Sequence, residues 1–508
     1  MLKKSLPHYR KNVTFINKFY CPALLSAAIL ILAFPPFEQG YLAWIALLPF
    51  ITKILSTTPA LSFKTGLLFG LALNLYVNFY LNQVLFTYLS RPLALLAMLL
   101  LAFYTSLFYG LFALSSNLVQ RLKCPWLTAM AVPILWMLFE FSRSIGFLGY
   151  NVGYLGYTQW QYSGLLNIAA TYGYWGLPFL IVFVQTILVM FLDKKIHNKE
   201  LAVVSSAFML ILTCGLFVPS LMKTEQSEET LRTNLIQGNS SMEQILRSRT
   251  EVAQNYLGLT ENSTEPGTDL VVWPETVLDI YTSGEQFHNA ELQKIADNLE
   301  TAILYGARLK DRGNLYNIIT IYDSSNHSES FYKKTRLVPF VEFFPAEELL
   351  NNLLQLNLIL GSYTPGNEIT LFDIKGNTIA GVICFESYFG NHTRLFAREG
   401  AKHLFVLTND AWFGRSIGLD HHAHAAAIRA AEMGIGISQV ANSGITVSFD
   451  YRGSEIYRSD KQKIETIPLV LDLTVRETPY KLLGDYFPLL WAFCLAVTIL
   501  LKKFFKTA

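Results

Sequence analysis

Long apolar runs dominate the first 221 residues of the chain, and one more run lies near its C-terminus. A helix needs about 20 apolar residues to cross the hydrocarbon core of a bilayer. Eight runs reach or approach this length, at 20–35, 41–55, 65–86, 93–117, 125–142, 164–192, 201–221 and 485–501. The first two are short and are separated by the turn Phe34-Pro-Pro-Phe37. The pattern predicts a polytopic helical membrane domain with about eight spans.

Between the last two runs the pattern changes to that of a water-exposed domain. Short apolar runs such as 270–273, 302–305, 318–322 and 404–407 alternate with helix-like stretches at 241–259, 287–299, 391–399 and 422–434. Such alternation is typical of a layered α/β domain. We therefore expect three parts: an N-terminal membrane domain of about seven helices (1–221), an α/β domain (222–484), and a C-terminal membrane helix with a tail (485–508).

Composition agrees with this division. Hydrophobic residues make up 52% of the 508 residues and charged residues only 15%, whereas a soluble domain has about 25% charged residues. The net charge is +2, and no basic patch interleaved with aromatic residues suggests a nucleic acid partner. Phe34-Pro-Pro-Phe37 stands where a signal peptide would have a small-residue cleavage site, so we expect the first helix to be retained.

The distribution of cations predicts the orientation in the membrane. Lysine and arginine cluster before the first run, in alternate connections and after the last run, which is the positive-inside pattern. The residues are Lys3, Lys4, Arg10, Lys11, Lys18, Lys53, Lys64, Arg121, Lys123, Lys194, Lys195, Lys199, Lys502, Lys503 and Lys506. Both termini are therefore expected in the cytoplasm and residues 222–484 outside it. Glu140 and Arg143, at the end of one run, either face the protein interior or extend to the interface.

Cys384 is the only one of five cysteines outside an apolar run. It ends the strand-like stretch 378–383, and Glu386 follows two residues later. No second thiol is near, so a disulfide within this domain and a thiolate metal site are both poorly supported. The position leaves two interpretations open, a nucleophilic thiol and a small buried core residue.

Two further polar residues follow strand-like runs. Glu275 follows 271–274, and Lys334 follows 331–333. Strand ends in α/β sheets collect catalytic groups. A carboxylate can take the proton of a thiol, and a lysine can stabilise the thiolate and an oxyanion. Taken singly, Glu275 could cap a helix and Lys334 could be a surface lysine, and sequence alone does not show that the three residues meet.

Several ordered motifs carry a family resemblance. They include Trp273-Pro-Glu-Thr276, Lys334-Thr-Arg-Leu-Val-Pro-Phe-Val-Glu342, Gly381-Val-Ile-Cys-Phe-Glu386 and Asn409-Asp-Ala-Trp-Phe-Gly414, with Tyr316-Asn317, Arg429-Ala-Ala-Glu432 and Asn442-Ser-Gly-Ile445 between and after them. Together they resemble the bacterial apolipoprotein N-acyltransferases of the nitrilase-like superfamily. The resemblance extends over nearly the whole chain and implies an α-β-β-α sandwich for residues 222–484.

The resemblance also implies a Glu-Lys-Cys triad and a two-step acyl transfer. Glu275 matches the general base, Lys334 the oxyanion-stabilising lysine and Cys384 the nucleophile, while Glu342 and Glu386 match supporting carboxylates. Cys384 would take an acyl chain from a membrane glycerophospholipid as a thioester. The α-amino group of the diacylglyceryl-cysteine of an apolipoprotein would then accept the chain. The implied location is the bacterial cytoplasmic membrane, with the catalytic domain on its extracytoplasmic side.

Other residues have less certain roles. We expect Phe385, Trp412 and Phe413 to bind substrate, with plain packing as the alternative for the last two. The leucine-rich stretch 343–360 is expected to be a lid arm that dips into lipid, or else a buried core helix. His421, His422 and His424 suggest a metal at first sight, but the family motif contains a single histidine, at His422. We therefore expect no metal and no soluble cofactor, and no feature requires more than a monomer.

The chain departs from the family pattern at several positions. Phe385 stands where tyrosine is frequent, Val341 where glycine is usual, and Leu246 near an expected aromatic residue. Leu419, His421, Ile435 and Gln439 also replace more common residues. These departures affect donor choice and rate rather than reaction class, because the triad is intact. Two other functions remain open, a membrane-tethered amidase of the nitrilase type and a non-catalytic membrane protein.

Overall fold

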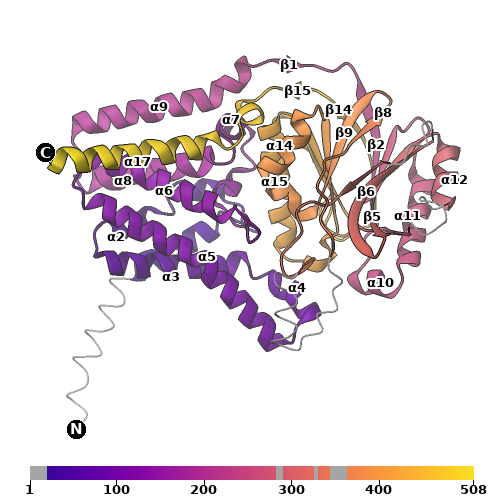
Figure 1. The fold of residues 1–508 in the computed structure, drawn as a ribbon, viewed down its shortest axis with the longest axis horizontal. Helices are drawn as coiled ribbons and strands as arrows, with labels where there is room; N and C mark the ends of the chain where they lie inside the picture. The colour runs from indigo at the N-terminus through magenta and orange to yellow at the C-terminus, as the bar shows by residue number, and fades with distance from the viewer. Residues whose placement is uncertain (1–19, 282–289, 325–329, 344–362, 508) are drawn as a thin grey trace, which may run out of the picture. The chain divides into compact units, whose positions relative to one another are not determined.

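The computed structural model describes residues 20–281, 290–324, 330–343 and 363–507. The chain forms two compact units (Figure 1). The first comprises Met1–Ser220 and Asp485–Ala508, and the second comprises Leu221–Gly484. The second unit is therefore an insertion in the sequence of the first.

The first unit is helical. After a first helix at Tyr20–Ile31, its elements are η1 (Gly40–Trp44), α2 (Leu48–Leu55), α3 (Pro59–Val77), α4 (Leu81–Tyr88), α5 (Arg91–Gln120), α6 (Pro125–Arg143), η2 (Leu155–Gln159), α7 (Ser163–Tyr172), α8 (Gly176–Leu192), α9 (Asn198–Leu221) and α17 (Tyr486–Thr507). Within the described residues, four helices are long and apolar enough to cross a membrane, namely α3, α5, α6 and α9, and the bent pair α7–α8 is a possible fifth. Three shorter apolar helices lie at Tyr20–Ile31, Gly40–Leu55 and Tyr486–Lys502.

Two of the expected spans are broken. The run 65–86 is not one helix, because α3 ends at Val77 and α4 starts at Leu81. The break falls at Asn78, a buried polar residue whose side-chain oxygen accepts a hydrogen bond from Tyr150 at 2.6 Å. The run 164–192 bends by 108° between α7 and α8, at Gly173, whose φ of 70° belongs to a backbone region that favours glycine. Apolar composition alone does not report either break.

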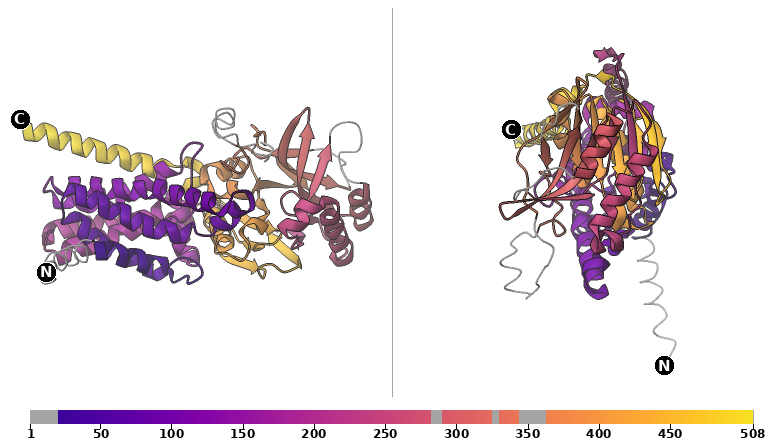
Figure 2. Two further views of the ribbon diagram at one scale, coloured as in Figure 1. Left: turned by 90° about the horizontal axis from the view of Figure 1, so that it is seen from below. Right: turned by 90° about the vertical axis from the view of Figure 1, so that its right-hand side faces the viewer.

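The helices of the first unit pack side by side (Figure 2), and small residues lie where they approach most closely. A Cβ at Gly66 of α3 would lie 2.3 Å from the carbonyl oxygen of Tyr109 in α5, so only glycine permits this approach. Phe69, Phe112 and Trp136 form aromatic contacts around the same crossing, including Phe69–Tyr109 at 5.4 Å and Phe112–Trp136 at 5.1 Å.

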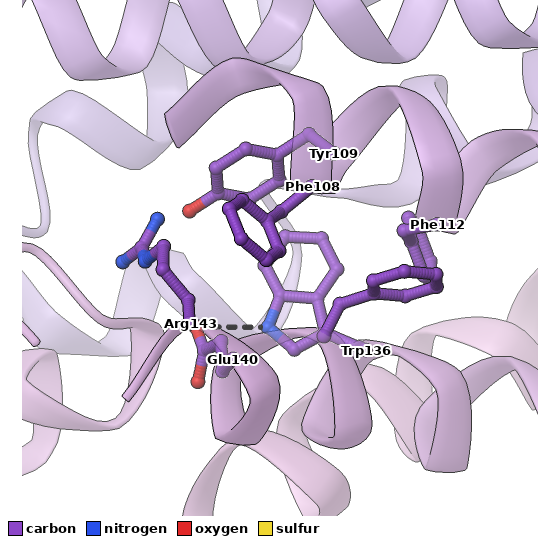
Figure 3. A pocket seen from close by; sticks show the side chains of 7 residues that line it. Phe108, Tyr109, Phe112, Trp136, Glu140 and Arg143 are labelled. Carbon is purple, nitrogen blue, oxygen red and sulfur yellow. Dashed lines mark hydrogen bonds between the residues drawn. The ribbon is translucent and has the colours of Figure 1, made fainter. Parts of the chain in front are cut away.

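Glu140 and Arg143 both face the interior of this unit, with exposed fractions of 4% and 1% (Figure 3). Glu140 accepts hydrogen bonds from Trp136 Nε1 at 3.1 Å and from Tyr174 Oη at 3.0 Å. The Arg143 guanidinium stacks over the Tyr154 ring at 4.2 Å. Of the two expected alternatives, the structure therefore shows the one in which both side chains face the protein interior.

The second unit contains two large sheets. One has the strand order β14-β2-β3-β5-β6-β7, with β4 paired to β5, and the other has the order β13-β12-β11-β10-β9-β8. The strands of the first sheet are β2 (Thr230–Gln237), β3 (Leu270–Val272), β4 (Leu278–Tyr281), β5 (Ala302–Asp311), β6 (Asn314–Asp323), β7 (Phe331–Lys333) and β14 (Glu465–Asp472). Those of the second are β8 (Leu371–Ile374), β9 (Asn377–Ile383), β10 (His403–Thr408), β11 (Gly436–Ala441), β12 (Val447–Phe449) and β13 (Glu455–Arg458).

Helices cover the outer face of each sheet (Figure 1). The elements are α10 (Met242–Arg247), α11 (Arg249–Ser263) and α12 (Ala290–Leu299) on the first sheet, and α14 (Gly390–Arg398) and α15 (Gly418–Met433) on the second. Short elements complete the unit: η3 (Cys384–Tyr388), η4 (Asp410–Phe413), α16 (Pro479–Leu483) and the pair β1 (Thr224–Glu225) and β15 (Val475–Arg476). The inner faces meet where a Cβ at Gly381 of β9 would lie 2.7 Å from Ile319 Cδ1 of β6. The expected α-β-β-α sandwich is confirmed.

The sandwich arrangement determines where the site can form. Strands β2, β3 and β5 run parallel in one sheet, and β9, β10 and β11 run parallel in the other. The carboxyl ends of parallel strands lie at one edge of a sheet, where binding residues collect. The expected lid arm at 343–360 lies, apart from Phe343, outside the described residues.

Candidate active site

Glu275 lies just after β3 and reaches toward the second sheet. Its Oε1 accepts a hydrogen bond from Asn317 Nδ2 at 2.7 Å, and its Oε2 accepts one from the backbone N–H of Asn409 at 2.9 Å. The Lys334 ammonium lies 3.7 Å from Oε1. Burial raises the pKa of Glu275, and although Lys334 opposes this shift, the nearby Glu342 adds to it. The carboxylate is thus held in position and is ready to take a proton.

Lys334 follows β7 and is almost completely buried. Its Nζ donates to Glu342 Oε1 at 2.8 Å. Glu342 also accepts from Asn317 Nδ2 at 3.3 Å and from the Val338 N–H at 2.8 Å. Burial disfavours the ammonium, but the charges of Glu342 and Glu275 outweigh burial and raise the pKa of Lys334. The lysine is therefore a permanent positive charge between two carboxylates.

Cys384 is the first residue after β9 and starts η3. Its φ of 51° lies in the left-handed region, which is strained for a residue with a side chain. Burial raises the pKa of its thiol well above the usual value, Glu275 raises it further, and Lys334 partly offsets both. The raised pKa favours the protonated thiol.

Glu386 forms a separate set of hydrogen bonds. Its Oε1 accepts from Tyr332 Oη at 2.7 Å and from the Thr335 and Arg336 N–H groups at 2.8 and 3.0 Å. Its Oε2 accepts from the Ile383 N–H at 2.9 Å. The carboxylate thus ties the loop after Lys334 to the residue before Cys384.

The structure brings Glu275, Lys334 and Glu342 into direct contact, and the charges of Glu275 and Lys334 act on the Cys384 thiol. It also adds a residue that received no role from the sequence. Asn317 donates to both Glu275 and Glu342 and so fixes the two carboxylates relative to each other. Its signal was the Tyr316-Asn317 motif.

The aromatic residues expected to bind substrate are half-buried. The ring of Phe385 packs edge-to-face on Phe389 at 5.0 Å, and Trp412 and Phe413 belong to η4. Their roles stay predictions. Val341 stands where the family usually has glycine. In this chain the left-handed backbone conformation belongs to Phe340, with φ of 62°, and not to Val341. A glycine is therefore not required at position 341 in this chain.

The other departures occupy varied surroundings. Leu246 is exposed on α10, while Leu419, His421, Ile435 and Gln439 are buried. The Gln439 amide donates to the Ile445 carbonyl at 3.0 Å. Burial lowers the pKa of His421 to about 3, so this residue is neutral.

One cluster has donor atoms suited to a metal ion. Ligand atoms of Cys384, Asp410 and His422 all lie within 4.8 Å of one another. Both ring nitrogens of His422 already contact protein groups, with Asp410 Oδ1 and the Cys384 carbonyl each at 3.1 Å. A cation would have to displace at least one of these contacts.

Known proteins match both units of the chain. Residues 26–187 match the family model for the N-terminal domain of apolipoprotein N-acyltransferase, and residues 233–475 match that for carbon-nitrogen hydrolases. A Geobacter metallireducens protein named apolipoprotein N-acyltransferase is 29% identical over 454 residues, 85% of each chain. A Haemophilus influenzae protein of the same name is 28% identical over 505 residues, 95% of each chain. Among solved structures, nitrilase-superfamily Nit3 from Saccharomyces cerevisiae aligns with 17% identity and a TM-score of 0.39, over 49% of this chain and 93% of its own.

The chain joins a unit of apolar helices to a carbon-nitrogen hydrolase unit, whose site contains a cysteine, a lysine and two carboxylates. These two parts define a nitrilase-like protein that carries a membrane-type helical domain. Within that class, the family model for residues 26–187 and the full-length relatives point to one family. Over nearly its whole length the chain is similar to the apolipoprotein N-acyltransferases.

Proposed function

We propose that this protein transfers a fatty acyl chain from a membrane glycerophospholipid to the α-amino group of the diacylglyceryl-cysteine of an apolipoprotein. The observation that carries the proposal is the contact of Glu275 and Lys334, which act by charge on Cys384, in a chain that also carries a unit of membrane-type helices. A soluble amide would not require those helices. Full-length relatives bearing the name apolipoprotein N-acyltransferase support the same reaction.

In the first half-reaction, Glu275 takes the proton of the Cys384 thiol as the sulfur attacks the ester carbonyl of the phospholipid. The Lys334 ammonium stabilises the oxyanion that forms. The C–O bond then breaks, Glu275 returns the proton to the departing oxygen, and a lysophospholipid leaves. The enzyme keeps the acyl chain as a thioester on Cys384.

In the second half-reaction, the α-amino group of the lipoprotein cysteine attacks the thioester carbonyl. Glu275 accepts a proton from the amine, Lys334 again stabilises the oxyanion, and the C–S bond breaks. The proton returns to the Cys384 sulfur and an amide forms on the lipoprotein. Glu342 and Asn317 hold Lys334 and Glu275 in position through both steps.

We propose that the first unit crosses the bacterial cytoplasmic membrane eight times and that both termini lie in the cytoplasm. In this arrangement residues 222–484 form the extracytoplasmic catalytic domain. The positive-inside distribution of cations supports this orientation, and the insertion of the second unit between α9 and α17 agrees with an even number of spans. The orientation is tested with single cysteines introduced at exposed positions of residues 222–484. These cysteines should react with a membrane-impermeant thiol reagent in intact spheroplasts.

The direct test is incubation of the purified protein with phospholipid, followed by intact mass spectrometry. The expected product is an acyl adduct on wild-type protein, absent from Cys384→Ala and from Glu275→Gln. Release of the adduct by a diacylglyceryl-cysteine peptide completes the cycle. No adduct on wild-type protein, together with ammonia release from small amides, would instead favour the amidase.

A further inference from the structure

Asp410 and His422 form a buried hydrogen-bonded pair beside Cys384, and the mechanism above does not use it. Asp410 starts η4, after β10, and His422 lies on α15. Their exposed fractions are 0% and 2%. A ligand atom of each lies within 4.8 Å of the Cys384 sulfur. Two segments from different parts of the chain thus converge on Cys384.

Both ring nitrogens of His422 face hydrogen-bond acceptors. Nδ1 lies 3.1 Å from Asp410 Oδ1, and Nε2 lies 3.1 Å from the carbonyl oxygen of Cys384. A carbonyl and an ionised carboxylate can only accept, so both contacts are satisfied when the imidazole carries two protons. Burial lowers the pKa of His422, but the Asp410 carboxylate outweighs burial and raises it.

The carbonyl that His422 contacts belongs to the strained residue. Cys384 holds a left-handed φ of 51°, a conformation that persists only where surrounding contacts enforce it. Ser387 Oγ donates to the same carbonyl at 3.0 Å, and the Tyr388 ring stacks on the imidazole at 5.4 Å. The imidazole is therefore fixed in place and, with Ser387 Oγ, is one of the side-chain groups that hold this carbonyl.

We propose that His422, oriented by Asp410, is a positioning residue that holds the Cys384 carbonyl and so keeps the nucleophile in the conformation that aims its sulfur at the acyl group. The proposal rests on the thioester mechanism proposed above. It differs from general acid–base catalysis, because His422 contacts the backbone of the nucleophile and transfers no proton to substrate.

The raised pKa of His422 predicts that the rate of thioester formation depends on pH. The groups that face His422 are Thr408 at the end of β10, Asp410 of η4, and Cys384, Ser387 and Tyr388 of η3, with the more distant charge of Glu275. The imidazolium contact is complete below the pKa of His422 and is lost as the pH rises through it. Thioester formation should therefore slow as the pH rises above the pKa of His422.

Two substitutions in the full-length protein test the proposal. In His422→Gln, the side-chain amide can reach the place of Nε2, so it keeps a donor for the Cys384 carbonyl but does not titrate. His422→Leu removes the donor. The matched control is His403→Gln, a change at a buried histidine of β10 whose Nε2 contacts Ser438 Oγ at 2.9 Å. The measurement is single-turnover thioester formation from phospholipid vesicles, followed by intact mass from pH 6 to about 10, a range that spans ordinary and raised histidine pKa values.

The Leu variant should form the thioester about 10²-fold more slowly at saturating phospholipid, with an unchanged KM, because misplacement of reacting atoms acts on the chemical step. The Gln variant should stay within about tenfold of wild type, since it keeps the donor, and should lose the alkaline decline. The control should match wild type in rate and in pH profile.

Wild-type rates in the Leu variant, or a wild-type alkaline decline in the Gln variant, would overturn the proposal. If the Leu variant does not fold, as judged by its melting temperature, the pH profile of the Gln variant decides alone. If wild-type protein forms no thioester at all, the proposed function fails instead. The rate of Cys384 alkylation by iodoacetamide then tests the positioning role. The pH dependence of this rate should differ between wild type and the Gln variant, and identical profiles would overturn the proposal.

Discussion

Substitution of Glu386 by glutamine should destabilise the second unit strongly, although Glu386 does not contact the reacting atoms in our mechanism. Its side chain is completely buried. Both carboxylate oxygens accept hydrogen bonds, one from the Ile383 N–H and the other from Tyr332 and the loop after Lys334. A glutamine amide accepts at one end only, so its NH2 group would face a donor at the other end.

The pKa of Glu386 gives the size of the expected loss in folding free energy. Burial raises this pKa, but His392, Lys334 and the hydrogen bonds outweigh burial and lower it from 4.5 to about 2. Each tenfold change in an acid constant corresponds to about 1.4 kcal/mol, so the surroundings favour the ionised group by about 3 kcal/mol. For a domain of this size, such a loss lowers the melting temperature by roughly 6–12 °C.

The assay is thermal melting of the purified protein in detergent, with Glu261→Gln as control, because Glu261 is exposed on α11. Since the folded pKa is depressed, the stabilisation is present above pH 4.5 and is lost as the pH falls toward about 2. The difference between wild type and Glu386→Gln should therefore narrow over this interval. Equal melting temperatures at neutral pH, or a difference that stays constant on acidification, would refute the reasoning.

Two further substitutions test the geometry of the triad. Glu342→Gln removes the charge that Lys334 contacts at 2.8 Å, so thioester formation, measured by intact mass, should slow by about 10²-fold. The melting temperature should also fall, because the buried Lys334 ammonium loses a compensating charge; an unchanged rate would contradict the supporting role. Gly306→Ala would place a Cβ 2.6 Å from the Glu275 Cα, so it should abolish thioester formation by displacing the base. A Cβ at Gly258 of α11 meets no atom within 4 Å, so Gly258→Ala is the matched control and should keep full activity.

The local pattern of apolar and polar residues was sufficient to predict much of the architecture. The switch from long apolar runs to short alternating ones located the helical and α/β regions, because burial in lipid and in a layered sheet leave different periodicities. The helix-like stretch 391–399 corresponds to α14 and 422–434 to the greater part of α15. The breaks at Asn78 and Gly173 were not predicted, because hydropathy averages over a window and does not register a single polar contact or one left-handed residue.

The sequence by itself determined which chemical groups are available: a cysteine outside the apolar runs, a carboxylate and a lysine after strands, and motifs that resemble one family. Only the tertiary structure decided which of them meet. Glu275 and Asn409 are hydrogen-bonded although 134 positions separate them, and Asp410 and His422 reach Cys384 from different elements. Contacts of this kind depend on how two sheets pack against each other, and that packing sums many weak interactions that no local pattern of residues encodes.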